Sequence, residues 1–506
     1  MKRIFFFFLV FTFFTSLSAQ QKMNLTLQDA LRLSQTQSLQ SFFVKNTYLA
    51  GYWEYKSFQA NYLPELSFNS NLVSYANANQ LRYNSSTQTD EFVRTESLHS
   101  DASLSVKQNV GITGGTFFME SSLNRNQNFG SAPYTQLSSR PFRIGYQQEL
   151  FGYNRFKWER QLEPQKYEKA MRQYLHDVEQ TNQQACTYFF NLAIAGVNRE
   201  MAVFNYHHTD TLVQVARKRF QLGTIQKDEL LQLELSLNNK SIELEEAHMN
   251  FRKQNEAFVT FLRLPAETDV QILLPGIMDL KVPERKALDL ARERNAAMLE
   301  HQIQLVQDQA KVAETKAKNR FQANLNISYG INKADGFYDY ENDVPVNGEI
   351  GNVYRPDFDQ YQELGVKVGI PILDWGRRKG QYQLAKSRQT INRIAVEQAT
   401  VKFEQDVITK VLEFNLQYNK VQSAAKSDSL AKNSYELTST RFRKGSVDVL
   451  KLTSSQNAKD QARLQYIQSL YQYWADFYAV RHYTLYDFQT NQTLEEDFEA
   501  LLKSLK

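Results

Sequence analysis

The sequence predicts a mainly α-helical protein with an additional β part, arranged as an internal duplication. Three observations carry this prediction. Short motifs recur in the same order in both halves, glycine and proline are scarce (19 and 10 of 506 residues), and a few segments alternate polar with apolar residues. Scarce glycine and proline favour long uninterrupted helices, and alternation with a period of two residues is typical of strands.

The N-terminus has the features of a secretory signal peptide. Lys2 and Arg3 precede the apolar run 4–14, and Ala19 ends a stretch of small residues. We therefore expect residues 1–19 to be a cleaved leader. The run is shorter than a membrane-spanning helix requires, and no later stretch is apolar enough to form one. The exported chain is expected either to be soluble outside the cytoplasm or to span a membrane as a β-barrel.

Composition excludes several classes of site. The single cysteine, Cys186, rules out a disulfide framework and a multi-cysteine zinc site. The formal net charge of +4 falls close to neutral once the leader is removed, which gives no electrostatic case for nucleic acid. His207 and His208 are adjacent, so on a helix they point about 100° apart and do not share a metal easily. No HExxH, P-loop or GxSxG motif occurs, so we expect no enzyme, metal or cofactor.

The duplication is visible in three pairs of matching motifs. The pairs are 30–34 with 287–291, 149–155 with 371–377, and 219–225 (RFQLGTI) with 441–447 (RFRKGSV). Each copy is therefore interpreted as helix, strands, long helix, glycine turn and long helix. The first copy carries an enlarged connection before residue 149.

The helices after the strands are expected to be very long. Residues 381–444 and 446–506 contain neither glycine nor proline. An unbroken helix of about 60 residues would be about 90 Å long, so it must pack lengthwise against its neighbours. On the helices alone, a generic coiled coil remains an alternative.

The strand segments argue against a coiled coil. Residues 324–332 and 364–372 alternate polar or small residues with apolar ones without a slip, and 66–69 and 142–146 do so in the first copy. A strand with one row of side chains facing lipid and the other row facing water would have this pattern. A half-buried soluble sheet is the competing interpretation. A further pair, 104–106 and 116–119, turns at residues 113–115, and the sequence leaves open whether it joins the same sheet.

Two clear strands per copy give four per chain. Four strands are too few to close a membrane barrel, which needs about eight, and lipid does not tolerate open strand edges. The chain is therefore expected to oligomerise or to lie outside a membrane.

These elements give the expected domain organisation. Residues 1–19 form the leader, 20–265 the first repeat, 266–283 a linker and 284–506 the second repeat. The expected elements are strands at about 64–76, 139–150, 323–332 and 361–373, an extra hairpin at about 101–126, helical hairpins at 155–264 and 377–488, and a C-terminal tail.

The motif order resembles that of the TolC-like outer-membrane efflux family. The resemblance rests on three features: the segment Ala287-Leu288-Asp289-Leu290-Ala291, the looser match Leu150-Phe151-Gly152-Tyr153-Asn154-Arg155, and the two Arg-Phe-x-x-Gly turns. The resemblance covers essentially the whole mature chain. It implies a homotrimer that shares a 12-stranded barrel in the cell outer membrane, with the helices stacked into a hollow periplasmic cylinder.

The resemblance also implies a function and partners. Such a protein is a passive exit duct of a tripartite efflux or type I secretion system, which works with a periplasmic adaptor (membrane fusion) protein and an inner-membrane RND or ABC transporter. The cargo, whether a drug, a metal ion or a polypeptide, does not follow from the sequence. The alternative from a different class is a periplasmic or surface coiled-coil structural protein.

Site residues follow from the resemblance residue by residue. The adaptor-docking positions at the two glycine turns are Gly223, Thr224, Ile225, Gly445, Ser446 and Val447. The periplasmic aperture positions are Glu229, Asp448, Lys451 and Ser454. Well-known members carry an acidic ring after the second-copy glycine, whereas this chain has Lys451 and Ser454 there, so gating by that ring is not expected. A plain helical turn without a partner is the alternative for the tips.

Overall fold

A computed structural model of the chain describes residues 22–84, 87–129, 134–335, 337–339, 344–346, 359–370 and 372–504. The expected leader, 1–19, and Pro371 of the repeat motif lie outside the described residues. The chain divides into two compact units. Of the described residues, the helical unit comprises those up to Leu49, Ala170–Met298 and those from Thr400 onward, and the sheet unit comprises those within Ala50–Lys169 and Leu299–Ala399.

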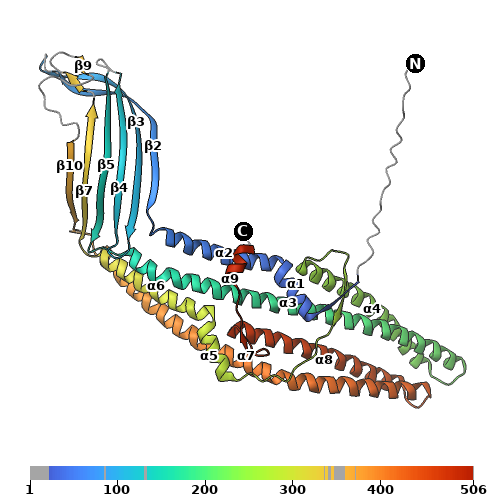
Figure 1. Ribbon diagram of the computed structural model, residues 1–506. Helices are drawn as coiled ribbons and strands as arrows, with labels where there is room; N and C mark the ends of the chain where they lie inside the picture. Colours follow the sequence, from blue (N-terminus) through green and yellow to red (C-terminus); the bar gives the residue numbers. More distant parts are fainter. Residues whose placement is uncertain are drawn as a thin grey trace, which may run out of the picture. The chain divides into compact units, whose positions relative to one another are not determined.

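Long helices dominate the chain (Figure 1). The helices are α1 (Leu27–Gln37), α2 (Leu39–Ala60), α3 (Arg155–Gln221), α4 (Lys227–Leu262), α5 (Glu284–Arg294), α6 (Ala296–Lys318), α7 (Arg377–Arg443), α8 (Val449–Thr484) and α9 (Phe498–Ser504). The duplication shows in their lengths, because α3 and α7 each have 67 residues and α4 and α8 each have 36.

The second helix of each hairpin ends before a residue in the left-handed conformation. Helix α8 ends at Thr484 because Leu485 takes a left-handed conformation with φ of 47°. Its counterpart α4 ends in the same way at Arg263, with φ of 55°. A left-handed residue after the last turn stops a helix without requiring glycine. Helix α8 thus ends four residues before the expected end of the second hairpin at residue 488.

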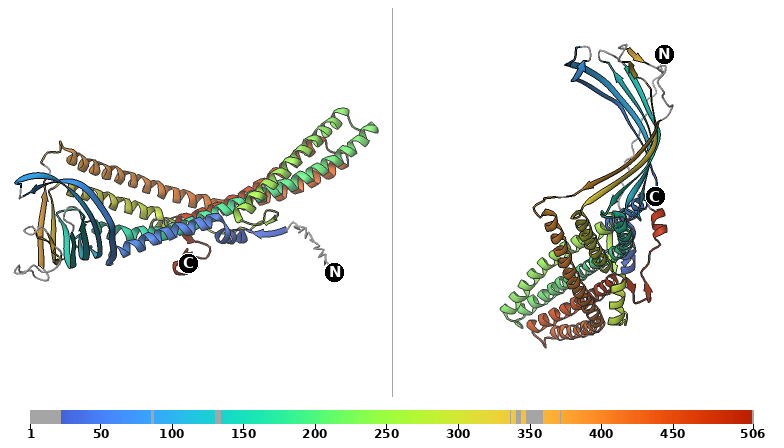
Figure 2. Two further views of the ribbon diagram at one scale, coloured as in Figure 1. Left: turned by 90° about the horizontal axis from the view of Figure 1, so that it is seen from above. Right: turned by 90° about the vertical axis from the view of Figure 1, so that its left-hand side faces the viewer.

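The main sheet has six antiparallel strands in the order β10-β7-β5-β4-β3-β2. They are β2 (Glu65–Asn84), β3 (Thr89–Val110), β4 (Gly115–Asn128), β5 (Tyr134–Leu150), β7 (Gln322–Asp335) and β10 (Asp359–Gly369). Figure 2 shows this sheet curved across its strands. Three two-stranded sheets complete the described strands: β1 (Lys22–Thr26) with β6 (Asp269–Leu273), β8 (Phe337–Asp339) with β9 (Val344–Val346), and β11 (Tyr486–Asp487) with β12 (Gln492–Thr493).

The structure settles the question that the sequence left open about the extra hairpin of the first repeat, and one predicted strand is longer than expected. The extra hairpin is full-length and sits inside the sheet as β3 and β4, so one chain supplies six strands rather than four. Strand β2 extends to Asn84, beyond the expected end at residue 76. The missed segments, such as Thr89–Asp101, carry polar residues on both faces, so they lack the alternation of apolar residues that a sequence pattern needs.

Two other boundaries also differ. Strand β10 ends at Gly369, short of the expected residue 373, because its partner β7 begins at Gln322 and the last paired residues are Gly369 and Gln322. The expected linker 266–283 contains β6, which pairs in parallel with β1 from Lys22–Asp269 to Thr26–Leu273. The linker therefore pairs, through β6, with the strand at the start of the first repeat.

The core of the helical unit is aromatic and draws on both repeats. Phe189, Phe190 and Phe258 come from the first repeat, and Phe414 and Tyr473 from the second, and each is almost completely buried. Cys186 is fully buried in this core, which raises the pKa of its thiol. It is a small apolar core residue.

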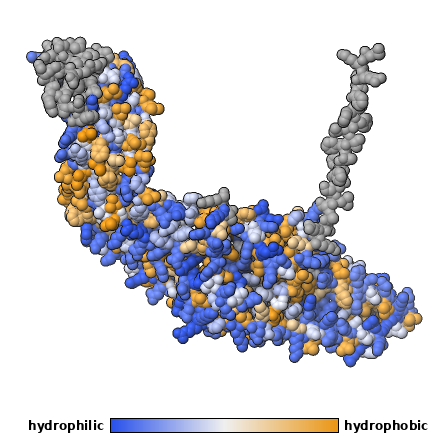
Figure 3. All heavy atoms as spheres, viewed as in Figure 1, coloured by the Kyte–Doolittle hydropathy of each residue, from blue (hydrophilic) through white to orange (hydrophobic). Residues whose placement is uncertain are grey.

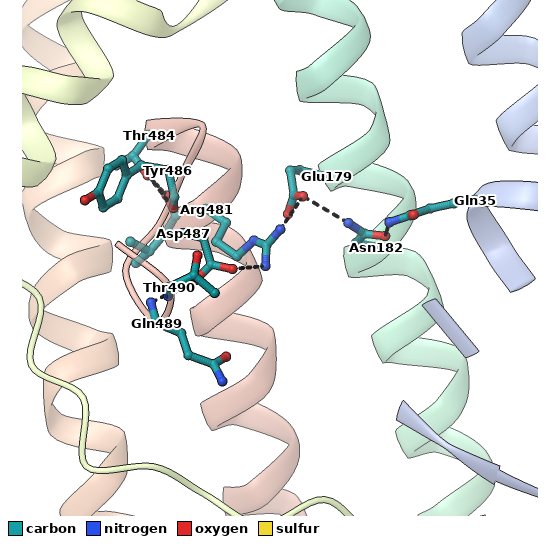
Figure 4. A network of polar contacts seen from close by, with 10 residues as sticks. Gln35, Glu179, Asn182, Arg481, Thr484, Tyr486, Asp487, Gln489 and Thr490 are labelled. Carbon is teal, nitrogen blue, oxygen red and sulfur yellow. Dashed lines mark hydrogen bonds and ion pairs between the residues drawn. The ribbon is translucent and has the colours of Figure 1, made fainter. Parts of the chain in front are cut away.

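A buried ion-pair network joins the repeats in the same unit (Figure 4). The Arg481 guanidinium on α8 donates to Glu179 Oε1 on α3 at 3.0 Å and to Asp487 Oδ2 at 2.9 Å. Asn182 donates to the same Glu179 oxygen at 3.0 Å, and Gln35 on α1 donates to Asn182 at 2.7 Å. The network therefore connects α1, α3 and α8.

Candidate functional site

The two hairpin turns have the same backbone structure. Gly223 and Gly445 have φ of +74° and +77°. In the first turn the N–H of Gly223 bonds the Phe220 carbonyl and the N–H of Thr224 bonds the Arg219 carbonyl, both at 2.9 Å. This pair of bonds is a Schellman motif, which ends a helix with a left-handed residue.

The second turn repeats these bonds at the end of α7. The N–H of Gly445 bonds the Phe442 carbonyl at 2.9 Å, and the N–H of Ser446 bonds the Arg441 carbonyl at 3.0 Å. Gly223, Thr224, Gly445 and Ser446 are exposed, and Ile225 and Val447 are half-buried. The predicted docking residues therefore occupy the outermost part of each hairpin.

The two tips contact each other within one chain. Arg219 Nη2 donates to the carbonyl of Arg443 at 3.1 Å, and its guanidinium lies 5.8 Å from the centre of the Phe442 ring. An apolar cluster below the turns includes residues of all four helices: Leu212, Val213, Ala216, Leu233, Tyr435, Phe442 and Leu452. The structure thus brings both sets of predicted docking residues to one end of the helical unit.

The predicted aperture residues follow the turns but have different local roles. Asp448 is the N-cap of α8, because its side chain accepts the Lys451 N–H at 2.8 Å. An aspartate at this position satisfies one of the unpaired N–H groups at a helix start. The side chains of Lys451 and Ser454 are exposed and Glu229 is half-buried. In the described part of the chain, the Lys451 ammonium forms no ion pair with Asp448 or Glu229.

Sequence reasoning missed three tip residues. Arg219 belongs to the repeated motif, but its bond to Arg443 depends on how the hairpins pack. Leu222 and Leu450 are each 77% exposed beside the turns. Large exposed apolar side chains next to a tight turn are a signal of a contact surface, and both could have been singled out from the predicted hairpins.

The sheet has one polar and one apolar face. Ser328 is 3% exposed, whereas its neighbours Ile327 and Tyr329 on the other face are 44% and 40% exposed. The predicted alternation along residues 325–331 is thus a real division between two faces. The apolar face continues across the sheet with exposed Leu364 and Val366, and Figure 3 shows apolar residues gathered over the sheet while the helices are mainly polar.

Several charged groups on the polar face are paired. Arg143 on β5 donates to Glu363 on β10 at 3.3 Å and lies 3.8 Å from Glu120 on β4. Ser328 also donates to Glu363, at 3.2 Å. Arg140 donates to Asn332 at 2.9 Å. A face of hydrogen-bonded charges opposite a face of exposed apolar residues suits a wall between water and lipid.

Among the described residues, no group of three or more His, Cys, Asp and Glu side chains could hold a metal ion. His208 lies 3.2 Å from the Tyr435 hydroxyl, and His207 is exposed.

Within the described ranges, no helix combines the length and the apolarity that crossing a membrane requires.

Comparisons with known proteins agree with this architecture. Residues 287–484 match the family described as outer membrane efflux protein. A comparison with curated proteins finds no match. The fold is similar to that of the CmeC outer membrane channel of Campylobacter jejuni, with a TM-score of 0.64, 14% identity, and coverage of 94% of this chain and 88% of that one.

Two further solved structures share the fold. The outer membrane protein VceC of Vibrio cholerae has a TM-score of 0.60 and 11% identity, with coverage of 93% of this chain and 97% of that one. A membrane protein from Pseudomonas aeruginosa has a TM-score of 0.62 and 12% identity, with 90% of each chain covered. The matched family is described as an outer membrane efflux protein, and these solved structures are described as an outer membrane channel and membrane proteins.

The family match agrees with the localisation predicted from the sequence, the cell outer membrane with an extension into the periplasm. It lies in the second repeat, while the fold likeness extends over nearly the whole chain. Residues 287–484 therefore match the outer membrane efflux protein family, and the chain as a whole has a fold similar to that of solved outer-membrane channels.

Proposed function

We propose that the protein is the passive exit duct of a tripartite efflux or type I secretion system. In this proposal three copies form the duct, a periplasmic adaptor binds the hairpin tips, and an inner-membrane RND or ABC transporter supplies the cargo. The observation that carries the proposal is the pair of matched Schellman turns at one end of the helical unit, flanked by exposed Leu222 and Leu450. Exposed apolar groups around a tight turn suit the docking of another helical hairpin.

The repeat symmetry supports a ring of copies. Arg219 binds the carbonyl of Arg443 on the second hairpin of its own chain. Its repeat counterpart, Arg441, is exposed, and among the described residues its guanidinium has no such acceptor. The counterpart of Arg443 is Gln221. In a ring, Arg441 would bind the Gln221 carbonyl of the next copy, so that all hairpins would be joined by the same contact.

The tip is tested by changing Gly445 in two ways. Gly445→Val should abolish adaptor cross-linking and transport, because a β-branched residue does not tolerate φ of +77°. Gly445→Asn should keep both, since asparagine adopts the left-handed conformation readily. The measurements are trimer yield in the outer membrane, cross-linking to the adaptor, and export. Full export by Gly445→Val would mean that the tip is only a turn.

Lys451 provides the contrasting variant for this experiment. Its side chain is exposed, within the first turn of helix after the cap at Asp448. Lys451→Ala should preserve adaptor cross-linking but change single-channel conductance or ion selectivity in a planar bilayer, since a ring of charges at a constriction sets selectivity. Unchanged conductance and selectivity would place the constriction elsewhere.

A further inference from the structure

The first repeat contributes four strands to the main sheet, whereas the second repeat contributes two. The first repeat therefore has one additional hairpin, β3–β4. We propose that β3 and β4 are part of the barrel wall, so that three copies close a barrel of eighteen strands by pairing β2 of each copy with β10 of the next. Two strands per repeat would give twelve. This inference rests on the proposed trimeric duct, and it adds the size of the barrel and the surfaces that join the copies.

The hairpin is paired along both of its outer sides. Strand β3 pairs with β2 from Lys107–Glu65 to Thr89–Asn84. Strand β4 pairs with β5 from Thr116–Gln147 to Asn128–Tyr134. The hairpin therefore separates β2 from β5, whereas the corresponding strands of the second repeat, β7 and β10, pair directly. It is an insertion into the sheet and not a flap above it.

The hairpin has the same two faces as the rest of the sheet. Ser105 is 8% exposed on the polar face and accepts or donates a hydrogen bond with Ser67 at 2.8 Å. Glu120 lies on that face beside Arg143 of β5. On the other face Leu104 and Met119 are 47% and 40% exposed, in line with the exposed residues of β7. The hairpin thus fits the same boundary between water and lipid.

Hydrogen bonds hold the turn of the hairpin at the end of the sheet where the neighbouring strands join helices α2 and α3. Gln148 at the end of β5 donates to the Thr113 carbonyl at 2.8 Å. Asn154, just before α3, donates to the Ile112 carbonyl at 3.1 Å. Asn109 donates to the carbonyl of Asn61, just after α2, at 3.0 Å. These bonds hold the hairpin at the level where the neighbouring strands meet their helices.

The two edges of the sheet are suited to each other. Six strands that alternate in direction leave β2 and β10 antiparallel, so β2 of one copy can pair with β10 of the next in a continuous antiparallel ring. Apolar residues reach both edges: Leu66 and Phe68 on β2 are 66% and 68% exposed, and Leu364 on β10 is 74% exposed. Lipid requires every edge to be paired, and six strands are too few to close alone. A second copy of this chain is therefore the partner of each edge.

The additional strands widen the duct at its sheet end. Barrel diameter grows roughly in proportion to strand number, so eighteen strands give a barrel about one and a half times as wide as twelve. Natural barrels of 16–18 strands already enclose an aqueous channel.

The direct test is an electron cryomicroscopy map of the full-length protein in lipid nanodiscs, in which the strands of the barrel are counted. Eighteen strands in a trimer are expected. A trimer with twelve strands and the β3–β4 hairpin outside the wall would overturn this inference while leaving the proposed duct intact. A monomer or a soluble protein would contradict the proposed duct, and with it the shared barrel of eighteen strands.

Cysteine labelling gives an independent measurement. Leu104→Cys should react with a lipid-phase reagent and Ser105→Cys with an aqueous one. Ile327→Cys and Ser328→Cys on β7 are the matched control pair. Cys186 is fully buried and does not add background in the folded protein. Aqueous labelling of both hairpin positions, with alternate labelling on β7, would show that the hairpin lies outside the wall.

Discussion

Arg481→Ala should destabilise the protein more than any surface substitution. The change leaves the carboxylates of Glu179 and Asp487 without their cation, and Glu179 is 3% exposed. Burial already raises the pKa of the Glu179 carboxyl, although Arg481 opposes this effect. Removing one member of a buried ion pair costs about 3–5 kcal/mol. A large drop in the melting temperature in mild detergent is the expected result.

Arg292→Ala is the matched control for this prediction. Arg292 on α5 forms an ion pair with Glu404 at 2.8 Å, but its side chain is 48% exposed. Exposed pairs of this kind contribute about 0–1 kcal/mol. If Arg481→Ala and Arg292→Ala lower the melting temperature equally, the network contributes no more than a surface ion pair.

Acidification should destabilise the protein through His482. Its ring lies 3.6 Å from that of His176, centre to centre, and burial together with the neighbouring His176 lowers the pKa of His482 to about 3. An unfolded histidine titrates near 6.5, so between these values the unfolded chain binds the proton more tightly. The contribution of His482 to stability is complete above pH 6.5 and falls as the pH falls toward 3. At pH 5 the loss is about 2 kcal/mol.

The measurement compares melting temperatures at pH 7.5 and pH 5 in the native protein and in His482→Gln. The native protein should lose more stability than the variant. Both proteins keep Glu179, whose raised pKa acts in the opposite direction, so the comparison isolates His482. His207→Gln, at an exposed position, should behave as the native protein does. An equal loss in the His482→Gln variant would rule out this histidine as the acid-sensitive group.

The features that follow from local pattern were predictable from the sequence. The repeated RFxxG motif predicts two equivalent turns, and Gly223 and Gly445 end helices of equal length. Alternation predicts the two faces of β7 because apolar residues alternate there with polar or small ones along residues 324–332. The N-cap role of Asp448 also had a local signal, because aspartate before a helix is a common N-cap. The family resemblance predicted only an aperture position for this residue.

Features that depend on packing were not predictable. Glu179 and Arg481 are separated by 302 positions, and only the packed helices bring them together. The bond from Arg219 to Arg443 depends in the same way on how the two hairpins lie against each other. The outer half of β3 is polar on both faces, and its neighbours in the sheet rather than its own residues hold it as a strand. Strand number was therefore underestimated where hydrogen bonding, and not apolar alternation, stabilises the strand.

In the proposed duct several copies of this chain form one complex, and the mass of the intact complex is the decisive measurement. The full-length protein should be extracted from the outer membrane with a mild detergent and its mass measured by native mass spectrometry. Three chains in each complex are expected for the proposed trimer, in which the edges β2 and β10 find their partners in neighbouring copies. A stable single chain, or a protein recovered in the soluble fraction without detergent, would contradict it.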